Sequence, residues 1–103
     1  MGLVEKINGE ALDQLVQSGE KILADFYSDS CGPCKMLGFV LEDVAKSVEG
    51  VHIVKLDFDS NKETMEKYNV AGYPTMVIFE GGQEINRMKG LQQKPAIIKA
   101  IQG

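Results

Sequence analysis

Cys31 and Cys34 are the only cysteines of the chain, and only Gly32 and Pro33 separate them. An apolar run at residues 22–27 precedes the pair and is typical of a buried strand, whereas the apolar residues after it recur at helical spacing. The pair therefore lies where a strand passes into a helix. Pro33 suits the first turn of that helix, because a missing N–H group costs no hydrogen bond there.

Cys31, at the beginning of this predicted helix, is placed for nucleophilic chemistry. The unpaired N–H groups and the helix dipole stabilise a negative charge at that end, and the thiolate of Cys31 can supply it. We therefore expect the pKa of Cys31 to lie below the value of about 8.5 for a free thiol. Cys34 lies one helical turn further on, close enough to form a disulfide with Cys31. The pair is thus suited to thiol–disulfide exchange.

Two other uses of the cysteine pair have less support. A structural disulfide that closes so short a loop would remove little conformational entropy from the unfolded state. A structural zinc ion takes four ligands, and His52 is the only histidine of the chain. A zinc site would therefore have to be shared between two copies of the chain. We expect no metal and no other cofactor, only the redox-active pair itself.

Asp25 is the second residue that could take part in chemistry. It lies within the apolar run at residues 22–27, where burial of a charged carboxylate is unfavourable. Loss of hydration would raise the pKa of the carboxyl group, which could then exchange a proton with a cysteine near pH 7. The alternative is an aspartate at the end of a strand that accepts hydrogen bonds from a turn.

The rest of the chain supplies the elements that must position these residues. Strands are predicted at residues 3–7, 22–27, 51–56, 75–80 and 83–89, and helices between Asn8 and Gly19 and at residues 31–49, 60–68 and 91–101. Strand–helix–strand repeats require parallel pairing, and the turn at Gly81-Gly82 predicts a final antiparallel hairpin. We therefore expect one α/β domain over residues 1–103, with the order βαβαβαββα and a mixed five-stranded sheet flanked by four helices.

Several helix ends are predicted from their capping residues. Gly50 is expected to close the helix that begins at Cys31. Ser60 and Glu63 have the spacing of a capping box for the third helix. Pro95 is expected in the first turn of the last helix.

Two segments resemble the active-site segment and the cis-proline loop of the thioredoxin family: Asp25-Phe26 with Cys31-Gly32-Pro33-Cys34-Lys35, and Ala71-Gly72-Tyr73-Pro74-Thr75. The resemblance covers essentially the full length and implies the thioredoxin fold. It also implies a protein-disulfide reductase that acts on disulfide-containing proteins and is itself reduced again by a thioredoxin reductase. Cys31 would be the nucleophile and Cys34 the resolving cysteine, with Gly32 and Pro33 shaping the site.

The resemblance also implies roles for residues outside the cysteine motif. Asp25 would serve the second cysteine, and Lys55 matches a family lysine near that acid, although Lys55 could equally be an ordinary charge at a strand edge. Pro74 would follow a cis peptide bond and lie against the cysteine pair. Tyr73 would offer its backbone to an extended substrate strand.

Two glycines near the loop that contains Pro74 are expected to let partner chains approach the site closely. Gly72 and Gly90 match family glycines that allow close approach, although either could instead be a turn glycine. Lys35 occupies a position where a positive charge could help the Cys31 thiolate, but an exposed helix lysine is the simpler interpretation.

The chain departs from the family pattern at three positions. It has no tryptophan, and Tyr27 and Ser30 stand where the family usually carries tryptophans. Ser30 would therefore leave the substrate-binding rim less apolar. Phe39 replaces the usual helix proline, so that any kink is smaller or comes from Gly38. These changes bear on the choice of partners and leave the expected chemistry in place.

Charge and hydropathy narrow the function further. A net charge of −4 argues against nucleic-acid binding, which requires a basic surface. Residues 1–7 lack the basic and long apolar segments of a signal peptide, and no apolar run approaches the ~20 residues of a membrane span. We therefore expect a cytoplasmic monomer with neither a membrane nor a nucleic acid as its partner.

Two rival functions stay open. The same cysteine pair could serve an oxidase or isomerase, although Gly32-Pro33 resembles the reducing members of the family. The chain could also be a non-catalytic subunit with a thioredoxin fold. The changed rim at Asp29 and Ser30 favours that interpretation, while the presence of both cysteines opposes it.

Overall fold

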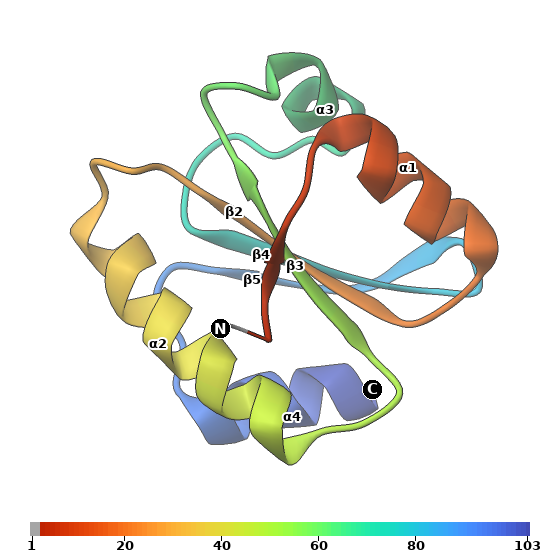
Figure 1. Ribbon diagram of the computed structural model, residues 1–103, viewed down its shortest axis with the longest axis vertical. Coiled ribbons are helices and arrows are strands. Elements are labelled where there is room, and N and C mark those ends of the chain that lie inside the picture. Colours follow the sequence, from red (N-terminus) through yellow and green to blue (C-terminus); the bar gives the residue numbers. More distant parts are fainter. Residues whose placement is uncertain (1–2) are drawn as a thin grey trace.

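The computed structural model describes residues 3–103; Met1 and Gly2, which the single-domain and signal-peptide predictions also cover, lie outside that part. The elements follow the predicted order (Figure 1): β1 (Glu5–Lys6), α1 (Gly9–Ser18), β2 (Ile22–Tyr27), α2 (Gly32–Ser47), β3 (His52–Asp57), α3 (Lys62–Lys67), β4 (Thr75–Glu80), β5 (Gln83–Lys89) and α4 (Lys94–Gln102).

The strands form one five-stranded sheet in the order β1-β3-β2-β4-β5. β1 and β2 both pair with β3 in parallel, whereas β4 pairs antiparallel with β2 and with β5. β2, which carries Asp25 and leads to the cysteines, is thus the central strand. The predicted α/β class with a mixed five-stranded sheet is confirmed.

Helices cover both faces of the sheet, with α1 and α3 on one side and α2 and α4 on the other (Figure 1). The residues of β2 alternate between the two cores. Phe26 packs on the side of Leu12 from α1 and Met65 from α3, whereas Leu23 packs on the side of Leu41 from α2 and Ile97 from α4. Both faces of β2 are buried, which explains why its sequence shows no alternation of apolar and polar residues.

Two predicted helix termini are wrong. α2 ends at Ser47, and Val48 in an extended conformation is its C-cap, so Gly50 lies in the following turn with a φ of 75°. The predicted capping box of α3 is absent, because the Ser60 hydroxyl donates to the Asp57 carboxylate instead. α3 begins after Asn61, which makes no side-chain cap hydrogen bond.

β3 is shifted by one residue from the predicted range 51–56, and the starts of β1 and α4 differ by more. β1 is reduced to two residues, Glu5–Lys6, at the edge of the sheet, so the predicted strand at residues 3–7 is too long. α4 begins at Lys94 rather than at residue 91. Pro95 occupies its first turn as predicted, and the Gln92 side chain donates to the carbonyl of Lys89 in the preceding segment.

Candidate active site

The candidate site lies at the carboxyl end of β2, where three loops converge. Thr75, the first residue of β4, pairs with Phe26, so the loop that ends in Pro74 reaches the end of β2. β3 ends beside it, since Tyr27 pairs with Asp57 and the Tyr27 carbonyl accepts a hydrogen bond from the Phe58 N–H at 2.7 Å. The sheet register therefore brings the cysteine loop, the loop after β3 and the loop before β4 to one edge.

Cys31 is the N-cap of α2. Its backbone is extended (φ −106°, ψ 113°), and its Sγ accepts a hydrogen bond from the Cys34 N–H at 3.1 Å. The Cys31 carbonyl accepts from the Lys35 N–H at 3.3 Å, and Pro33 lies in the first turn. The sulfur of Cys31 thus lies where unpaired helix N–H groups favour a thiolate.

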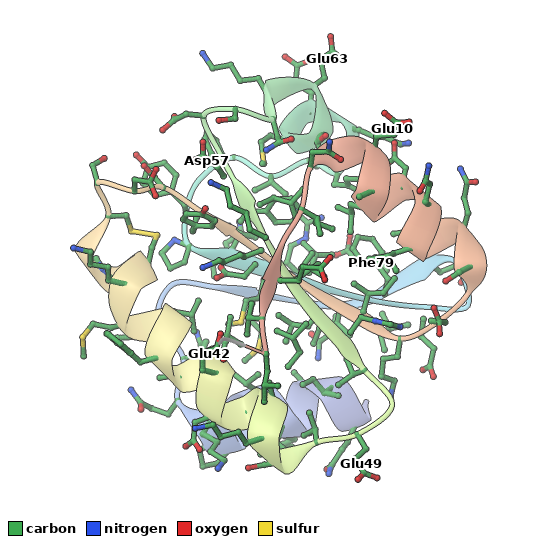
Figure 2. All side chains as sticks on the ribbon, in the orientation of Figure 1. Glu10, Glu42, Glu49, Asp57, Glu63 and Phe79 are labelled. Atoms are coloured by element: carbon green, nitrogen blue, oxygen red, sulfur yellow. A yellow bond between two sulfur atoms is a disulfide. The ribbon has the colours of Figure 1, made fainter. Side chains whose placement is uncertain are left out.

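The two cysteines form a disulfide, with their Cα atoms 5.2 Å apart. Figure 2 shows the sulfur–sulfur bond in yellow at the beginning of α2. Cys34 is only 5% exposed, whereas Cys31 is half-buried. The N-cap cysteine is therefore the more accessible residue of the two, which favours Cys31 as the one that meets a second molecule.

Asp25 is buried within β2, with 2% of its surface exposed. Its Oδ1 accepts no hydrogen bond from any of residues 3–103. Burial raises the pKa of its carboxyl group to about 7, and the positive charge of Lys55 opposes that rise. Lys55 lies directly across from Asp25 in the β2–β3 pairing. The acid can therefore change its protonation state near neutral pH.

A cavity of about 340 Å³ has this acid and Cys34 in its lining. Asp25, Cys34 and Lys55 line it, together with the exposed side chains of Lys35 and Phe39. Asp25 and Cys34 thus face one space whose lining includes exposed residues.

The Tyr73–Pro74 peptide bond is cis, as the resemblance implied. Two hydrogen bonds fix the loop at this point: the Thr75 hydroxyl donates to the Gly72 carbonyl at 2.8 Å, and the Gly90 N–H donates to the Pro74 carbonyl at 2.8 Å. Gly90 has a φ of 79°, a conformation that favours glycine. The Tyr73 side chain remains 45% exposed.

Three residues at the site, Ser28, Phe58 and Asp59, were not predicted from the sequence. The ring of Phe58 packs edge-on against the ring of Tyr73, with the centroids 5.2 Å apart. Ser28 is buried and its hydroxyl lies 3.3 Å from the Ser30 hydroxyl and 3.4 Å from Asp59 Oδ2. Phe58 and Asp59 follow β3 directly (Figure 2 labels Asp57 at the end of that strand). Their position just after a predicted strand, at the carboxyl edge of the sheet, was the signal by which the sequence could have indicated them.

The positions that depart from the family pattern can now be placed. Tyr27 is half-buried, and the Lys55 Nζ lies 5.7 Å from the centroid of its ring. Ser30 is exposed, and Phe39 is 75% exposed at the rim of the cavity. α2 continues without interruption from Gly32 to Ser47, so neither Phe39 nor Gly38 breaks the helix.

Within residues 3–103, no three His, Cys, Asp or Glu side chains lie together as a metal ion would require. The disulfide also uses both sulfurs that could bind a metal. In the same part of the chain, no helix combines the length and the hydropathy needed to cross a bilayer.

The Thioredoxin family model matches residues 3–103 of this chain. The chain is 39% identical to the thioredoxin of Chlamydia trachomatis serovar D over 99 residues, which are 96% of each protein. It is 38% identical to a thioredoxin of Staphylococcus aureus, over 95% of this chain and 94% of the relative. A mutant thioredoxin from Halobacterium salinarum superposes with a TM-score of 0.89 at 33% identity, covering 99% of this chain and 92% of that one.

Proposed function

Because the chain belongs to the thioredoxin family, and is a thiol–disulfide oxidoreductase, we propose that it reduces disulfide bonds in other proteins through Cys31 and Cys34. The observation that carries the proposal is the disulfide between these cysteines at the N-terminus of α2, with the more exposed cysteine at the N-cap. The buried acid, which lines one cavity together with the less exposed cysteine, supports it.

The first step forms a mixed disulfide. In the reduced protein, the Cys31 thiolate attacks one sulfur of the substrate disulfide. The bond between the two substrate sulfurs breaks, and the second substrate sulfur leaves as a thiolate that takes up a proton. The helix N-terminus stabilises the attacking thiolate, which supports Cys31 in this role.

The second step releases the substrate. The Cys34 thiol gives its proton to the Asp25 carboxylate, and the resulting thiolate attacks the Sγ of Cys31. The Cys31–Cys34 disulfide forms, and the remaining substrate sulfur leaves as a thiolate. Two electrons have then passed from the dithiol to the substrate. A pKa of about 7 for Asp25 allows it to accept this proton and return it to solvent through the shared cavity.

Substrate recognition in this proposal uses the loop before β4. The backbone of Tyr73 binds an extended segment of the substrate next to the substrate disulfide. The segment pairs with it through backbone hydrogen bonds, as in β-augmentation. Gly72 and Gly90 leave room for that segment, since within residues 3–103 no atom beyond the adjoining residues lies within 4 Å of a Cβ placed at either position. Gly32, Pro33 and Pro74 shape the site and Ser30 forms part of its rim, while Lys55 limits the rise in the pKa of Asp25.

The wider setting follows from this chemistry. A thioredoxin reductase returns the disulfide to the dithiol, and the substrates are proteins with accessible disulfides. The protein acts in the cytoplasm, where disulfides are kept reduced, as one domain over residues 1–103 and as a monomer. It needs no metal or other cofactor and binds neither nucleic acid nor a membrane.

The proposal is tested by the single-turnover oxidation of the reduced protein by insulin, quenched by alkylation and read by mass. We expect the wild type to end with the internal disulfide and free substrate thiols. Cys34→Ser should stop at the mixed disulfide, whose mass is that of the variant plus one insulin molecule. Cys31→Ser should not react at an appreciable rate. Equal rates for the wild type and Cys31→Ser would refute the assignment of the nucleophile.

A further inference from the structure

Arg87 is the only arginine of the chain, and its side chain is 21% exposed on β5. Its guanidinium makes four hydrogen bonds. Two go to the carboxylate of Glu84, from Nε at 2.8 Å and from Nη2 at 2.8 Å. The other two go to backbone carbonyls of a different element: Nη2 donates to Tyr68 at 2.6 Å, and Nη1 donates to Asn69 at 2.7 Å.

A bulge in the β4–β5 hairpin makes this arrangement feasible. Arg87 lies opposite Val77, and Glu84 lies opposite Phe79, so that Ile85 is the extra residue on β5. Val77 and Phe79 are two residues apart on β4 and therefore point to the same face, which is the one covered by α1 and α3. Without the extra residue, Glu84 and Arg87 would point to opposite faces.

The two carbonyls bound by Arg87 mark the end of α3. Tyr68 is the C-cap of this six-residue helix, and Asn69 has a φ of 56°. Carbonyls at a helix C-terminus lack partners within the helix and carry the negative end of its dipole, so a guanidinium suits them. Arg87 thus ties the end of α3 to the sheet by two charge-assisted hydrogen bonds.

The same carbonyls mark the beginning of the loop that leads to Tyr73. Only three residues, 70–72, separate Asn69 from Tyr73. The other end of this loop is held by the hydrogen bonds from Thr75 to Gly72 and from Gly90 to Pro74. Arg87 also lines the hollow formed by Tyr73, Pro74 and Gly90. Its contacts, together with the hydrogen bond from the Val70 N–H to the Met65 carbonyl, therefore hold the end of the loop that lies away from Pro74.

We propose that Arg87 is a positioning residue for protein substrates, because its hold on the Tyr68 and Asn69 carbonyls keeps the Tyr73 backbone in the place that an extended substrate segment requires. This inference rests on the proposed function, since it takes Tyr73 as the substrate-binding residue. Arg87 does not line the cavity that holds Asp25 and Cys34, so its loss should weaken substrate binding and leave the dithiol chemistry unchanged.

The test compares two disulfide substrates in single-turnover oxidation of the reduced protein. Insulin offers a peptide backbone to the loop, whereas hydroxyethyl disulfide is small, neutral and has no backbone. For Arg87→Gln we expect the half-saturating insulin concentration to rise about tenfold, with the maximal rate within about twofold of wild type. The rate with hydroxyethyl disulfide and the redox potential should not change.

Three further variants keep the test decisive. Lys99→Gln removes one positive charge from an exposed site on α4 and should match the wild type. Glu84→Gln leaves both carbonyl contacts of Arg87 in place and should lose much less than Arg87→Gln. Arg87→Lys keeps the charge without the planar fork, and it serves in place of Arg87→Gln if that variant does not fold.

The outcomes separate the inference from the function on which it rests. If Arg87→Gln binds insulin as Lys99→Gln does, or if its rate with hydroxyethyl disulfide falls in parallel, the positioning role is refuted and the oxidoreductase function stands. If the wild type itself fails to react with insulin, the proposed function has failed. Faster hydrogen exchange at the Val70 amide, which donates to Met65 at 2.8 Å, would confirm that the loop has loosened in Arg87→Gln.

Discussion

Replacement of Asp25 by asparagine should stabilise the oxidised protein at neutral pH and have little effect near pH 4. The pKa of the carboxyl group is raised by burial from 3.8 to about 7 in the folded protein. In the unfolded chain the same group returns to its ordinary pKa. As the pH rises above about 4, the unfolded state therefore releases its proton first, which favours unfolding. This loss of stability accumulates up to about pH 7 and stays constant above it.

The size of the effect follows from the two pKa values. They differ by roughly three pH units, each worth about 1.36 kcal/mol, so ionisation should cost about 4 kcal/mol of stability by pH 8. The asparagine side chain of the variant cannot ionise and avoids this loss. The difference in the free energy of unfolding between Asp25→Asn and the wild type should thus grow by about 4 kcal/mol between pH 4 and pH 8.

Urea unfolding of the oxidised proteins, followed by circular dichroism across this pH range, provides the measurement. The difference between the two proteins matters, because other carboxyl groups such as Glu42 and Glu84 have lowered pKa values and change stability in the opposite direction with pH. Asp29→Asn, at an exposed position in the cysteine loop, is the matched control. A difference between Asp25→Asn and the wild type that does not depend on pH would refute the reasoning.

Three other predictions concern the acid and the packing. Lys55→Met should raise the pKa of Asp25 above about 7, because it removes the positive charge that opposes the rise of this pKa on burial. NMR titration of the Asp25 carboxyl carbon measures this pKa, and an unchanged value would contradict the prediction. Gly9→Ala should cost about 1–3 kcal/mol in urea unfolding, because its Cβ would overlap the Thr64 hydroxyl oxygen, and wild-type stability would contradict this close approach of α1 and α3. Phe26→Ala should cost about 3–5 kcal/mol by the same measurement, since its side chain is fully buried between β2 and the α1–α3 layer; a loss below about 1 kcal/mol would mean that the core closes around the gap.

The central elements were predictable because their sequences carry strong local signals. β2 has the predicted bounds, since its apolar run is buried on both faces and ends where the cysteine loop begins. The start of α2 was predictable from Pro33. Its end was not, because Val48 caps the helix in an extended conformation and Gly50 only forms the turn that follows.

Polar side chains with several potential partners were harder to predict. The spacing of Ser60 and Glu63 favoured a capping box, but Asp57 lies close enough to accept the Ser60 hydroxyl. The two hydrogen bonds between Arg87 and Glu84 depend on a bulge at Ile85, and no local pattern in the sequence distinguishes a bulged strand from a regular one. Contacts between segments that are distant in the sequence determine which partner such a side chain binds.

The site was predictable to the extent that its residues lie in local motifs. The apolar run before Cys31 and the helical periodicity after Cys34 placed the pair at a helix N-terminus, and the apolar neighbours of Asp25 indicated its burial. The contact between Phe58 and Tyr73 joins two loops that are far apart in the sequence. It follows only from the sheet register, which brings the ends of β2 and β3 and the start of β4 to one edge.

The redox potential of the Cys31–Cys34 pair tests the central claim most directly. The protein is equilibrated in a series of thiol/disulfide buffers, and the fraction with the internal disulfide is measured by alkylation and mass. A protein-disulfide reductase should have a potential at or below the cytosolic glutathione range, roughly −220 to −320 mV. A potential well above that range, toward about −120 to −180 mV, would identify an oxidant or isomerase and contradict both the proposed direction of electron transfer and the cytoplasmic setting.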